Sequence, residues 1–305
     1  MQTIRTSVQV VDVGPEENGR KLLSFLEARL GALPAGLLMR LVRTGQVRID
    51  GRRCKPFDRV LAGQKVRIPP ITIEERKDNA PLDTSLDIVH EDNAMLLLNK
   101  PQGLPVHPGT GWTDSVHDRI KVRYPDQVFA PTPVHRLDRD TSGLLLCART
   151  HDFLRHMHTI WHLVAKGYLC WVQGNWQHEG WCKVESELAK QQTAQGEKMV
   201  SGSGKKAVSF VHAVQPGDRE SLLLVVLGTG KTHQIRVHLA DSGHPIIGDP
   251  KYGHGHGLRL HAALLGWPEH EFRIAPAWAG PFEISEELMN KAQTLFVSAP
   301  SKDFA

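Results

Sequence analysis

The sequence predicts an α+β protein that consists of a small basic α/β domain and a larger domain built on a mixed or antiparallel sheet. Between Arg40 and Arg67, nine basic residues stand against two acidic ones, so this segment alone exceeds the net charge of +4 of the whole chain. From about Leu86 onward, short apolar segments separated by turns are interrupted by occasional amphipathic stretches, a pattern typical of α+β domains. We place the domains at 18–70 and 86–297, with a linker at 71–85 and a disordered tail at 298–305.

The composition is that of an ordinary globular protein. The chain has 305 residues, of which 40% are hydrophobic and 23% are charged. No apolar stretch approaches the length that spans a membrane. The four cysteines are scattered and form no Cys-x-x-Cys pair, which argues against a disulfide framework and against a thiolate zinc site. We therefore expect a cytoplasmic protein with reduced thiols.

Local signals predict two helices and a hairpin in the basic domain. Leucines along Lys21–Leu30 share one helical face, and a second helix begins near Pro34 and ends at Gly45. Val47–Arg52 alternates in polarity around an Asp-Gly pair, which is a strong hairpin signal, and Lys65–Ile68 alternates again. Basic residues that gather on one helix face and on the hairpin that follows it are typical of a surface that binds a polyanion.

The larger domain is expected to contain several strands and three helices. Ile88-Val89 and Met95–Leu98 flank a turn and predict a hairpin. Lys166-Gly167-Tyr168 opens a strand, which would place the phenol ring at a strand edge. Further strands are expected at Tyr168–Val172, Ala207–Val214, Leu222–Leu227 and Leu258–Ala262, and helices near His151–His162, Thr232–Asp241 and Ser285–Phe296.

A dense cluster of charge precedes an apolar run in the larger domain. The segment His135-Arg136-Leu137-Asp138-Arg139-Asp140-Thr141-Ser142-Gly143 sets two carboxylates between two arginines. Such charge beside buried-looking sequence is costly to fold unless it is paired or used. Asp138, hemmed in by guanidinium groups, should stay ionised and serve as a nucleophile or a base. We expect Asp140 to brace the turn and Thr141–Gly143 to shape the loop.

Three other patterns imitate known sites, and each lacks an essential part. A Gly-Thr-Gly-Lys-Thr run ending at Thr232 imitates a phosphate-binding loop, but Val225 stands where that motif needs its first glycine. The runs Asp140–Gly143 and Asp241–Gly243 imitate the paired motifs of an aspartic protease, but the first run does not follow an apolar strand directly. His158 and His162 have the i, i+4 spacing of metal ligands, yet no cysteine or obvious carboxylate completes a set.

Three motifs in register resemble those of one enzyme family. They are His135-Arg136-Leu137-Asp138 with Thr141-Ser142-Gly143, Lys166 with Tyr168, and the run from Thr229 to His238. In order and spacing they resemble the RluA-type pseudouridine synthases, and the resemblance spans about residues 18 to 290.

The basic domain resembles the S4 RNA-binding domain. This pairing of domains is similar to the RluC/RluD subgroup, which modifies large-subunit (23S) ribosomal RNA. RluC is the more similar of the two, through Val47-Arg48, Lys55-Pro56, Val66–Pro70 and Asp138-Arg139-Asp140. The resemblance implies binding to ribosomal RNA or a pre-ribosomal particle by a monomer, with no membrane partner.

The resemblance also implies the reaction and its residues. Uridine would become pseudouridine without a cofactor or a metal, after the base is flipped into a pocket. Asp138 would attack the ribose or the base, or abstract a ribose proton. Arg236 would be its ion-pair partner. Tyr168 would stack on the uracil, with its hydroxyl available for proton transfer at C5. Arg136 would help to fill the space that the base leaves.

The remaining expected contacts follow from the matched motifs. Substrate contacts are expected from His135, Arg136, Lys100, Thr232, His233, Gln234 and Leu260. Contacts of the S4-like domain with RNA phosphates are expected from Arg20, Arg40, Arg43, Arg48, Arg52, Arg53 and Lys55.

The sequence departs from the family pattern in three places, of which the last two bear on substrate choice more than on chemistry. Lys231 stands where the family usually has arginine, a change that preserves charge. The stretch from Thr150 to Lys166 is shorter than usual, and Gly257 replaces a common arginine. Two rival hypotheses are a non-catalytic assembly factor that binds ribosomal RNA and an aspartic peptidase. The intact set of Asp138, Tyr168 and Arg236 argues against the assembly factor, and the charged residues that precede Asp140, together with the basic RNA-binding domain, argue against the peptidase.

Overall fold

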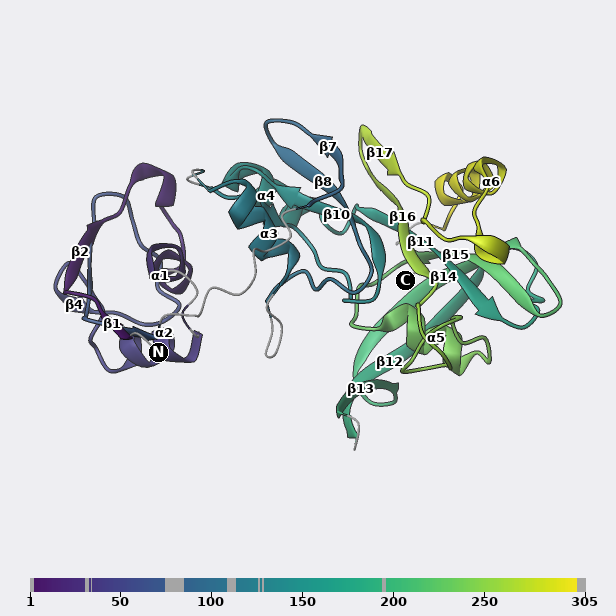
Figure 1. Ribbon diagram of the computed structural model, residues 1–305, viewed down its shortest axis with the longest axis horizontal. Helices are drawn as coiled ribbons and strands as arrows, with labels where there is room; N and C mark the ends of the chain where they lie inside the picture. Colours follow the sequence, from purple (N-terminus) through teal and green to yellow (C-terminus); the bar gives the residue numbers. More distant parts are fainter. Residues whose placement is uncertain are drawn as a thin grey trace. The chain divides into compact units, whose positions relative to one another are not determined.

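The computed structural model divides the chain into two compact units, with the boundary between Pro81 and Leu82. It describes residues 3–30, 33, 35–74, 85–108, 114–125, 127, 129–193 and 196–300. Most of the predicted linker and the last five residues of the predicted tail lie outside the described residues. Figure 1 shows the helices and strands of each unit.

Unit 1 packs two helices against a small antiparallel sheet. The helices bury Phe25, Leu26 and Leu38 against Val66 and Ile68 of the sheet. The strand order is β2-β5-β3-β4, and β1 pairs with β6 separately. The elements are β1 (Thr3–Arg5), β2 (Gln9–Asp12), η1 (Pro15–Glu17), α1 (Leu22–Leu30), α2 (Ala35–Arg43), β3 (Arg48–Ile49), β4 (Arg52–Arg53), β5 (Lys65–Ile68) and β6 (Thr72–Glu74).

The predicted helices and hairpin of the basic domain are confirmed, but its predicted bounds are too narrow. Asp50 and Gly51 both have positive φ, 48° and 77°, as a tight two-residue hairpin turn requires. β2 pairs with β5 although it precedes residue 18, and β6 lies within the predicted linker. Both strands are short, so the sequence pattern was too brief to reveal them.

Unit 2 is built on one large mixed sheet. The strand order is β13-β12-β14-β15-β11-β16-β10-β8-β7, with β17 on β16 and β9 on β10. The strands are β7 (Ile88–Glu91), β8 (Met95–Lys100), β9 (Thr132–Pro133), β10 (Ser142–Ala148), β11 (Ala165–Gln173), β12 (Cys182–Thr193), β13 (Gly196–Ser201), β14 (Lys205–Gln215), β15 (Glu220–Leu227), β16 (Leu260–Trp267) and β17 (His270–Arg273). The helices are α3 (Val116–Arg123), α4 (His151–Ile160), α5 (Gln234–Asp241), η2 (Gly280–Phe282) and α6 (Glu286–Val297).

The central strands are buried on both faces. On β11, Tyr168 belongs to one apolar cluster and its neighbour Leu169 belongs to another, because successive side chains point to opposite faces. α5 adds Ile235 to the first cluster and α6 adds Phe296 to the second. The two helices therefore cover opposite faces of the sheet (Figure 1).

The α+β prediction is confirmed, and the predicted helices and strands of unit 2 are present. Two details differ. β11 begins at Ala165, so Tyr168 lies inside the strand and not at its edge. The sequence prediction also missed α3, the strands β9, β10 and β17, and the hairpin of β12 and β13. The hairpin carries many Lys and Glu residues, which have low β propensity, and its two strands lie at one edge of the sheet.

β10 and β16 form the one parallel pair among the described strands of this sheet. Gly143 pairs with Ala262, and Ser142 Oγ lies 2.8 Å from Nδ1 of His261. Gly143 has a φ of 107°, and a Cβ there would overlap the backbone of Ala262. The Ser-Gly pair therefore permits a close approach of two strands that lie more than a hundred residues apart in the sequence.

Replacing Gly143 with alanine should strongly destabilise unit 2. The added methyl group must push β10 from β16 and must also adopt a disfavoured φ, so we expect a loss of more than about 3 kcal/mol. Gly243 is the matched control, since it has a φ of 82° but open space around it. Gly243→Ala should cost only about 1 kcal/mol. Denaturant unfolding measures both, and equal losses would contradict the packing argument.

Candidate active site

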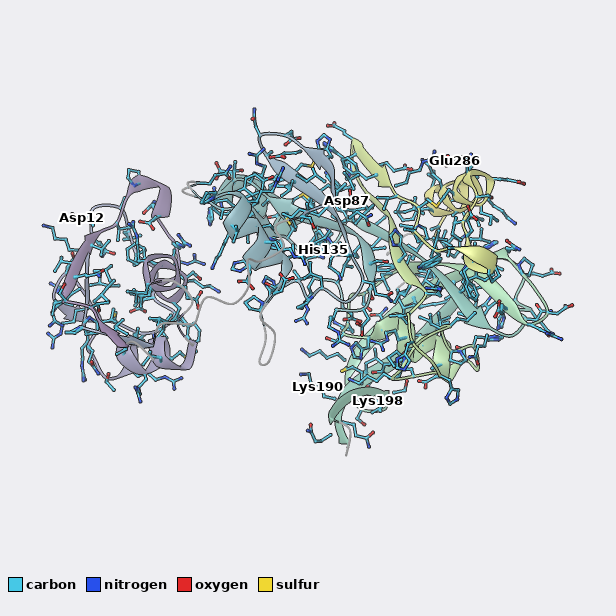
Figure 2. The ribbon with its side chains drawn as sticks, in the orientation of Figure 1. Asp12, Asp87, His135, Lys190, Lys198 and Glu286 are labelled. Carbon is cyan, nitrogen blue, oxygen red and sulfur yellow. The ribbon has the colours of Figure 1, made fainter. Side chains whose placement is uncertain are left out.

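A cavity of about 290 Å³ opens over β11, the central strand of the sheet. Its lining comes from the loop that precedes β10, from β11, from the segment that joins β15 to α5, and from Trp161. Nine of the ten residues predicted to contact or transform the substrate line it. These are His135 (Figure 2), Arg136, Asp138, Tyr168, Thr232, His233, Gln234, Arg236 and Leu260.

The sheet register brings the lining segments together. Because Gly143 pairs with Ala262 and Ala262 pairs with Tyr168, the loop before β10 reaches the cavity beside β11. The N–H of Thr141 donates to the Asp138 carbonyl at 3.2 Å and closes this loop into a turn. The cavity thus gathers residues that are widely separated in the sequence.

Asp138 presents its carboxylate to the cavity, with one-fifth of its side chain exposed. Nε2 of His233 lies 4.0 Å from Asp138 Oδ2. The neighbouring carboxylate has a different environment, because Arg139 holds Asp140 through contacts of 2.9 and 3.0 Å. The two carboxylates are therefore distinguished by geometry.

Arg236 does not pair with Asp138 as the sequence prediction had it. Its guanidinium donates two hydrogen bonds to Asp249, from Nε at 2.8 Å and from Nη2 at 2.7 Å. Asp249 is fully buried, and it also accepts hydrogen bonds from the N–H groups of Lys251 and Tyr252. Burial raises the pKa of the Asp249 carboxyl, but these hydrogen bonds and the Arg236 charge outweigh burial and hold it below its usual value.

Arg236 nevertheless stays close to the cavity and remains charged. Burial lowers its pKa, but the hydrogen bonds from Arg236 to Asp249 and the nearby negative charges of Asp249 and Asp138 raise it above its usual value. The bidentate geometry with Asp249 fixes the guanidinium plane. Arg236 is therefore a fixed positive charge near Asp138, held by a third residue.

Tyr168 is almost fully buried at the base of the cavity. Burial, and then the negative charge of Asp138, raise the pKa of its hydroxyl well above the usual value. The phenol therefore stays protonated near neutral pH and offers a flat ring and a hydrogen-bond donor. Leu260 and Leu227 add apolar surface to the lining.

His135 lines the cavity as a neutral ring held by the backbone. The N–H of Leu146 donates to its Nε2 at 3.0 Å, so this nitrogen carries no proton. Burial, and then the charge of Lys166, lower the pKa of His135 to about 3. The ring stacks on Trp161 at 5.1 Å between centroids, and together they form an aromatic wall.

Lys100, predicted as a substrate contact, lies outside the cavity lining. Its Nζ donates to the carbonyls of Pro101, Leu104 and Arg139 at 2.8–2.9 Å, and its side chain is buried. Burial lowers the pKa of Lys100 to about 7, although Asp140 and Asp138 oppose this shift. The amino group joins the loop after β8 to the loop that carries Asp138, and it therefore stabilises the Asp138 loop without lining the cavity.

Gln234 lines the cavity, but its amide is committed to the protein. Its Oε1 accepts from Thr229 and from the N–H of Lys231, and its Nε2 donates to Val208 and Ser209. These four hydrogen bonds use the full capacity of the amide. Gln234 therefore shapes the segment before α5 and has no hydrogen bond left for a substrate.

Arg136 and Thr232 are the exposed members of the predicted set. Both line the cavity, which places a flexible cation and a hydroxyl where the cavity meets solvent. Arg136 can therefore reach a ligand that enters.

Sequence reasoning missed three residues around the cavity. Asp249 fixes Arg236, Tyr252 contacts His233, and Trp161 forms the aromatic wall. Asp249 lies in the segment Gly243–Gly253, which is rich in glycine and proline, and nothing in the sequence pattern of this segment names a partner for its charge. Burial of Asp249 would have indicated that it has a partner of opposite charge, but the sequence does not show that burial.

The predicted RNA contacts of unit 1 are exposed, with one exception. Arg40, Arg43, Arg48, Arg52, Arg53 and Lys55 are exposed on α2 and the strands and loop that follow it. Arg20 is half-buried and lies 3.6 Å from Glu17. Their contact with RNA remains a prediction.

No helix in the described part of the chain is long and apolar enough to cross a membrane. Among the same residues, no three His, Cys, Asp or Glu side chains come together in a group that could hold a metal ion.

Comparison with known proteins identifies the family. Residues 94–241 match the family model described as RNA pseudouridylate synthase. The "Ribosomal large subunit pseudouridine synthase C" of Vibrio vulnificus is 34% identical over 98% of this chain and the whole of its own length. The chain belongs to the RNA pseudouridylate synthase family. It is therefore an isomerase that forms pseudouridine in RNA, and the family resemblance noted in the sequence is confirmed.

Other members agree with this assignment. A protein of the same name from Pasteurella multocida is 37% identical over 98% of this chain and 92% of its own length. The solved structure "Human RNA Pseudouridylate Synthase Domain Containing 1" has a TM-score of 0.59 and 22% identity, and the match covers 73% of this chain and 99% of that one. At that identity the human structure supports the fold alone.

The unfolding free energy of this pseudouridine synthase should fall as pH is lowered from about 6.5 towards 4. Burial lowers the pKa of His135 to about 3 and that of His261 to about 4. In this window the folded state keeps both rings neutral, whereas the unfolded chain protonates them at about 6.5. The unfolded state thus binds more protons, and each ring can contribute up to about 1.4 kcal/mol per pH unit.

Urea unfolding across this pH range measures the effect. His261→Gln should reduce the pH slope by about one proton, because that ring no longer titrates. An unchanged slope in His261→Gln would contradict the assignment.

Proposed function

We propose that this protein converts specific uridines of large-subunit ribosomal RNA to pseudouridine, with Asp138, Tyr168 and Arg236 at the reacting base. The convergence of these three side chains on one cavity carries the proposal. The names of the bacterial relatives support ribosomal RNA as the substrate. The proposal includes action as a monomer in the cytoplasm.

The reaction balances within the nucleoside. The bond between N1 and C1′ breaks, the uracil turns, and a bond between C5 and C1′ forms. C5 loses its proton and N1 gains one, so no electron and no phosphoryl group is transferred. The protein must therefore supply a pocket, a carboxylate and a path for one proton.

The cavity suits a flipped base. Its volume of about 290 Å³ is near the lower end for small-molecule pockets, about 300 Å³. Extruding a stacked base costs a few kcal/mol, and contacts in the pocket can offset this. Tyr168 would stack on the uracil, and the exposed Arg136 would enter the space that the base leaves in the RNA.

Asp138 is the proposed reactive group. Its carboxylate is partly exposed in the cavity, close to the fixed positive charge of Arg236. It would attack the ribose or the base, or remove a ribose proton. Tyr168 would take part in proton transfer at C5. Its raised pKa means that it enters the reaction as a neutral phenol, so it would relay a proton by giving up its own hydrogen as it accepts another.

The basic surface of unit 1 would supply affinity for RNA. Its exposed arginines and lysine are of the residue types that contact phosphates, and such contacts position the RNA without reading its sequence. We propose that this unit acts as an S4-like RNA-binding domain.

Asp138→Asn should lower the single-turnover rate more than about 1,000-fold. The amide keeps the shape of the side chain but removes its charge. Release of tritium from ribosomal RNA that carries 5-tritiated uridine measures the reaction, because C5 loses its hydrogen. Asp140→Asn is the control, and it should stay within about 10-fold of the wild type, since Asp140 pairs with Arg139. A fully active Asp138→Asn enzyme would refute the mechanism.

The double variant Arg40→Ala, Arg43→Ala should weaken RNA binding and flatten its salt dependence. Removing one arginine–phosphate interaction should reduce the slope of log Kd against log salt by about 0.7–0.9. Lys291→Ala, on α6 at the sheet face opposite the cavity cluster, should leave the slope unchanged. Filter binding over a range of salt concentrations measures both. Equal slopes in the double variant and the wild type would exclude the face of α2 that carries Arg40 and Arg43 from the RNA interface.

A further inference from the structure

His233 stands between the reactive carboxylate and Tyr252, a residue that the sequence prediction left without a role. Its Nδ1 lies 2.8 Å from the hydroxyl of Tyr252, and its Nε2 lies 4.0 Å from Asp138 Oδ2. The residue has a φ of 53° and precedes α5 directly. A non-glycine residue keeps this left-handed backbone conformation only where the surrounding structure fixes it.

The hydrogen bonds of Tyr252 determine which nitrogen of His233 carries the proton. The N–H of Met199 donates to the Tyr252 hydroxyl oxygen at 3.0 Å. Among the residues that the structure describes, Met199 and His233 are the two hydrogen-bond partners of this hydroxyl. Since an amide N–H can only donate, the single hydroxyl hydrogen has His233 Nδ1 as its acceptor.

Both groups keep the charge state that this arrangement needs. Burial raises the pKa of Tyr252 to about 12, so its hydroxyl keeps its hydrogen. Burial lowers the pKa of His233; the charges of Arg236 and Lys251 add to this, and those of Asp138 and Asp249 oppose it. The imidazole is therefore neutral near pH 7. A neutral ring that accepts at Nδ1 carries its proton on Nε2, the nitrogen nearer Asp138.

Tyr252 is itself held firmly. Its backbone N–H donates to Asp249, and its ring lies 5.1 Å from the Arg236 guanidinium and 4.7 Å from the Lys198 ammonium. Lys198 and Met199 belong to β13, and Figure 2 labels Lys198 on this hairpin. The hairpin of β12 and β13 thus fixes the tyrosine, and the tyrosine fixes the histidine.

We propose that His233 and Tyr252 are positioning residues for Asp138. The Tyr252 hydroxyl locks the histidine in its Nε2–H form. The positive end of this N–H dipole, 4.0 Å from Asp138 Oδ2, orients the reactive carboxylate by electrostatic attraction and not by a hydrogen bond. The proposal rests on the proposed function and deepens it, because it assigns Asp138 a partner other than Arg236. The opposite tautomer would turn a lone pair towards a carboxylate and leave the tyrosine hydrogen without an acceptor.

Two substitutions of His233 test the contributions of its two ring nitrogens separately. Glutamine can place an amide N–H near the position of Nε2, whereas asparagine reaches only the position of Nδ1. We expect His233→Asn to lower the single-turnover rate of tritium release about 10- to 100-fold. His233→Gln should stay within about 5-fold of the wild type. The Kd for RNA should stay unchanged in both.

Backbone strain predicts the opposite order, which makes the comparison decisive. Asparagine tolerates a positive φ better than glutamine does, so a merely structural role would favour His233→Asn. Equal rates in the two variants, or a faster asparagine variant, would overturn the proposal. If the wild-type enzyme itself releases no tritium from ribosomal RNA, the proposed function fails instead.

The tautomer of His233 can be determined independently of the enzymatic reaction. Nitrogen-15 spectra of the histidine rings distinguish Nε2–H from Nδ1–H, and the signals that disappear in His233→Asn identify the ring. We expect the Nε2–H form in the wild type and a mixture of tautomers in Tyr252→Phe, with a rate about 10-fold lower and RNA affinity unchanged. An Nδ1–H signal in the wild type, or a wild-type rate in Tyr252→Phe, would refute the proposal.

Discussion

The buried ion pair between Arg236 and Asp249 is the interaction on which the cavity depends. It joins the first turn of α5 to the loop of residues 243–253 and aligns a guanidinium with a carboxylate through two hydrogen bonds. Two charges in a buried position are costly unless their hydrogen bonds are satisfied, and here backbone N–H groups complete the set around Asp249. Removal of either partner would leave the other charge buried and unpaired, at a cost of about 3–5 kcal/mol.

This pair also separates two roles that a direct contact between Asp138 and Arg236 would merge. Because Asp249 takes the guanidinium, Asp138 keeps its oxygens available in the cavity. The positive charge of Arg236 still acts on Asp138 from a fixed position. Electrostatic support of this kind needs no rearrangement during a reaction, which is the property expected of a preorganised site.

The sequence predicted the residues of the site better than their partners. The resemblance of three motifs to those of a known family placed Asp138, Tyr168 and Arg236 at one site, because each motif is an uninterrupted local pattern. The partners of Arg236 and Lys100 could not be predicted, because they lie in loops whose path has no periodicity. Gln234 bonds to Val208 and Ser209 of β14, a strand that only tertiary packing brings beside it. Likewise, the pairing of β2 with β5 joins short strands far apart in the sequence, and only tertiary packing selects it.

The parallel register of Ser142 with His261 has a consequence for biosynthesis. The loop that carries Asp138 can reach its place only after residue 262 has left the ribosome, about 120 residues later. At about 5–20 residues per second, this delay lasts roughly 6 to 24 seconds. Unit 1 is a compact unit that ends at Pro81, so all of its residues have been synthesised before that interval begins. A nascent chain would thus hold a folded basic unit before its catalytic cavity exists.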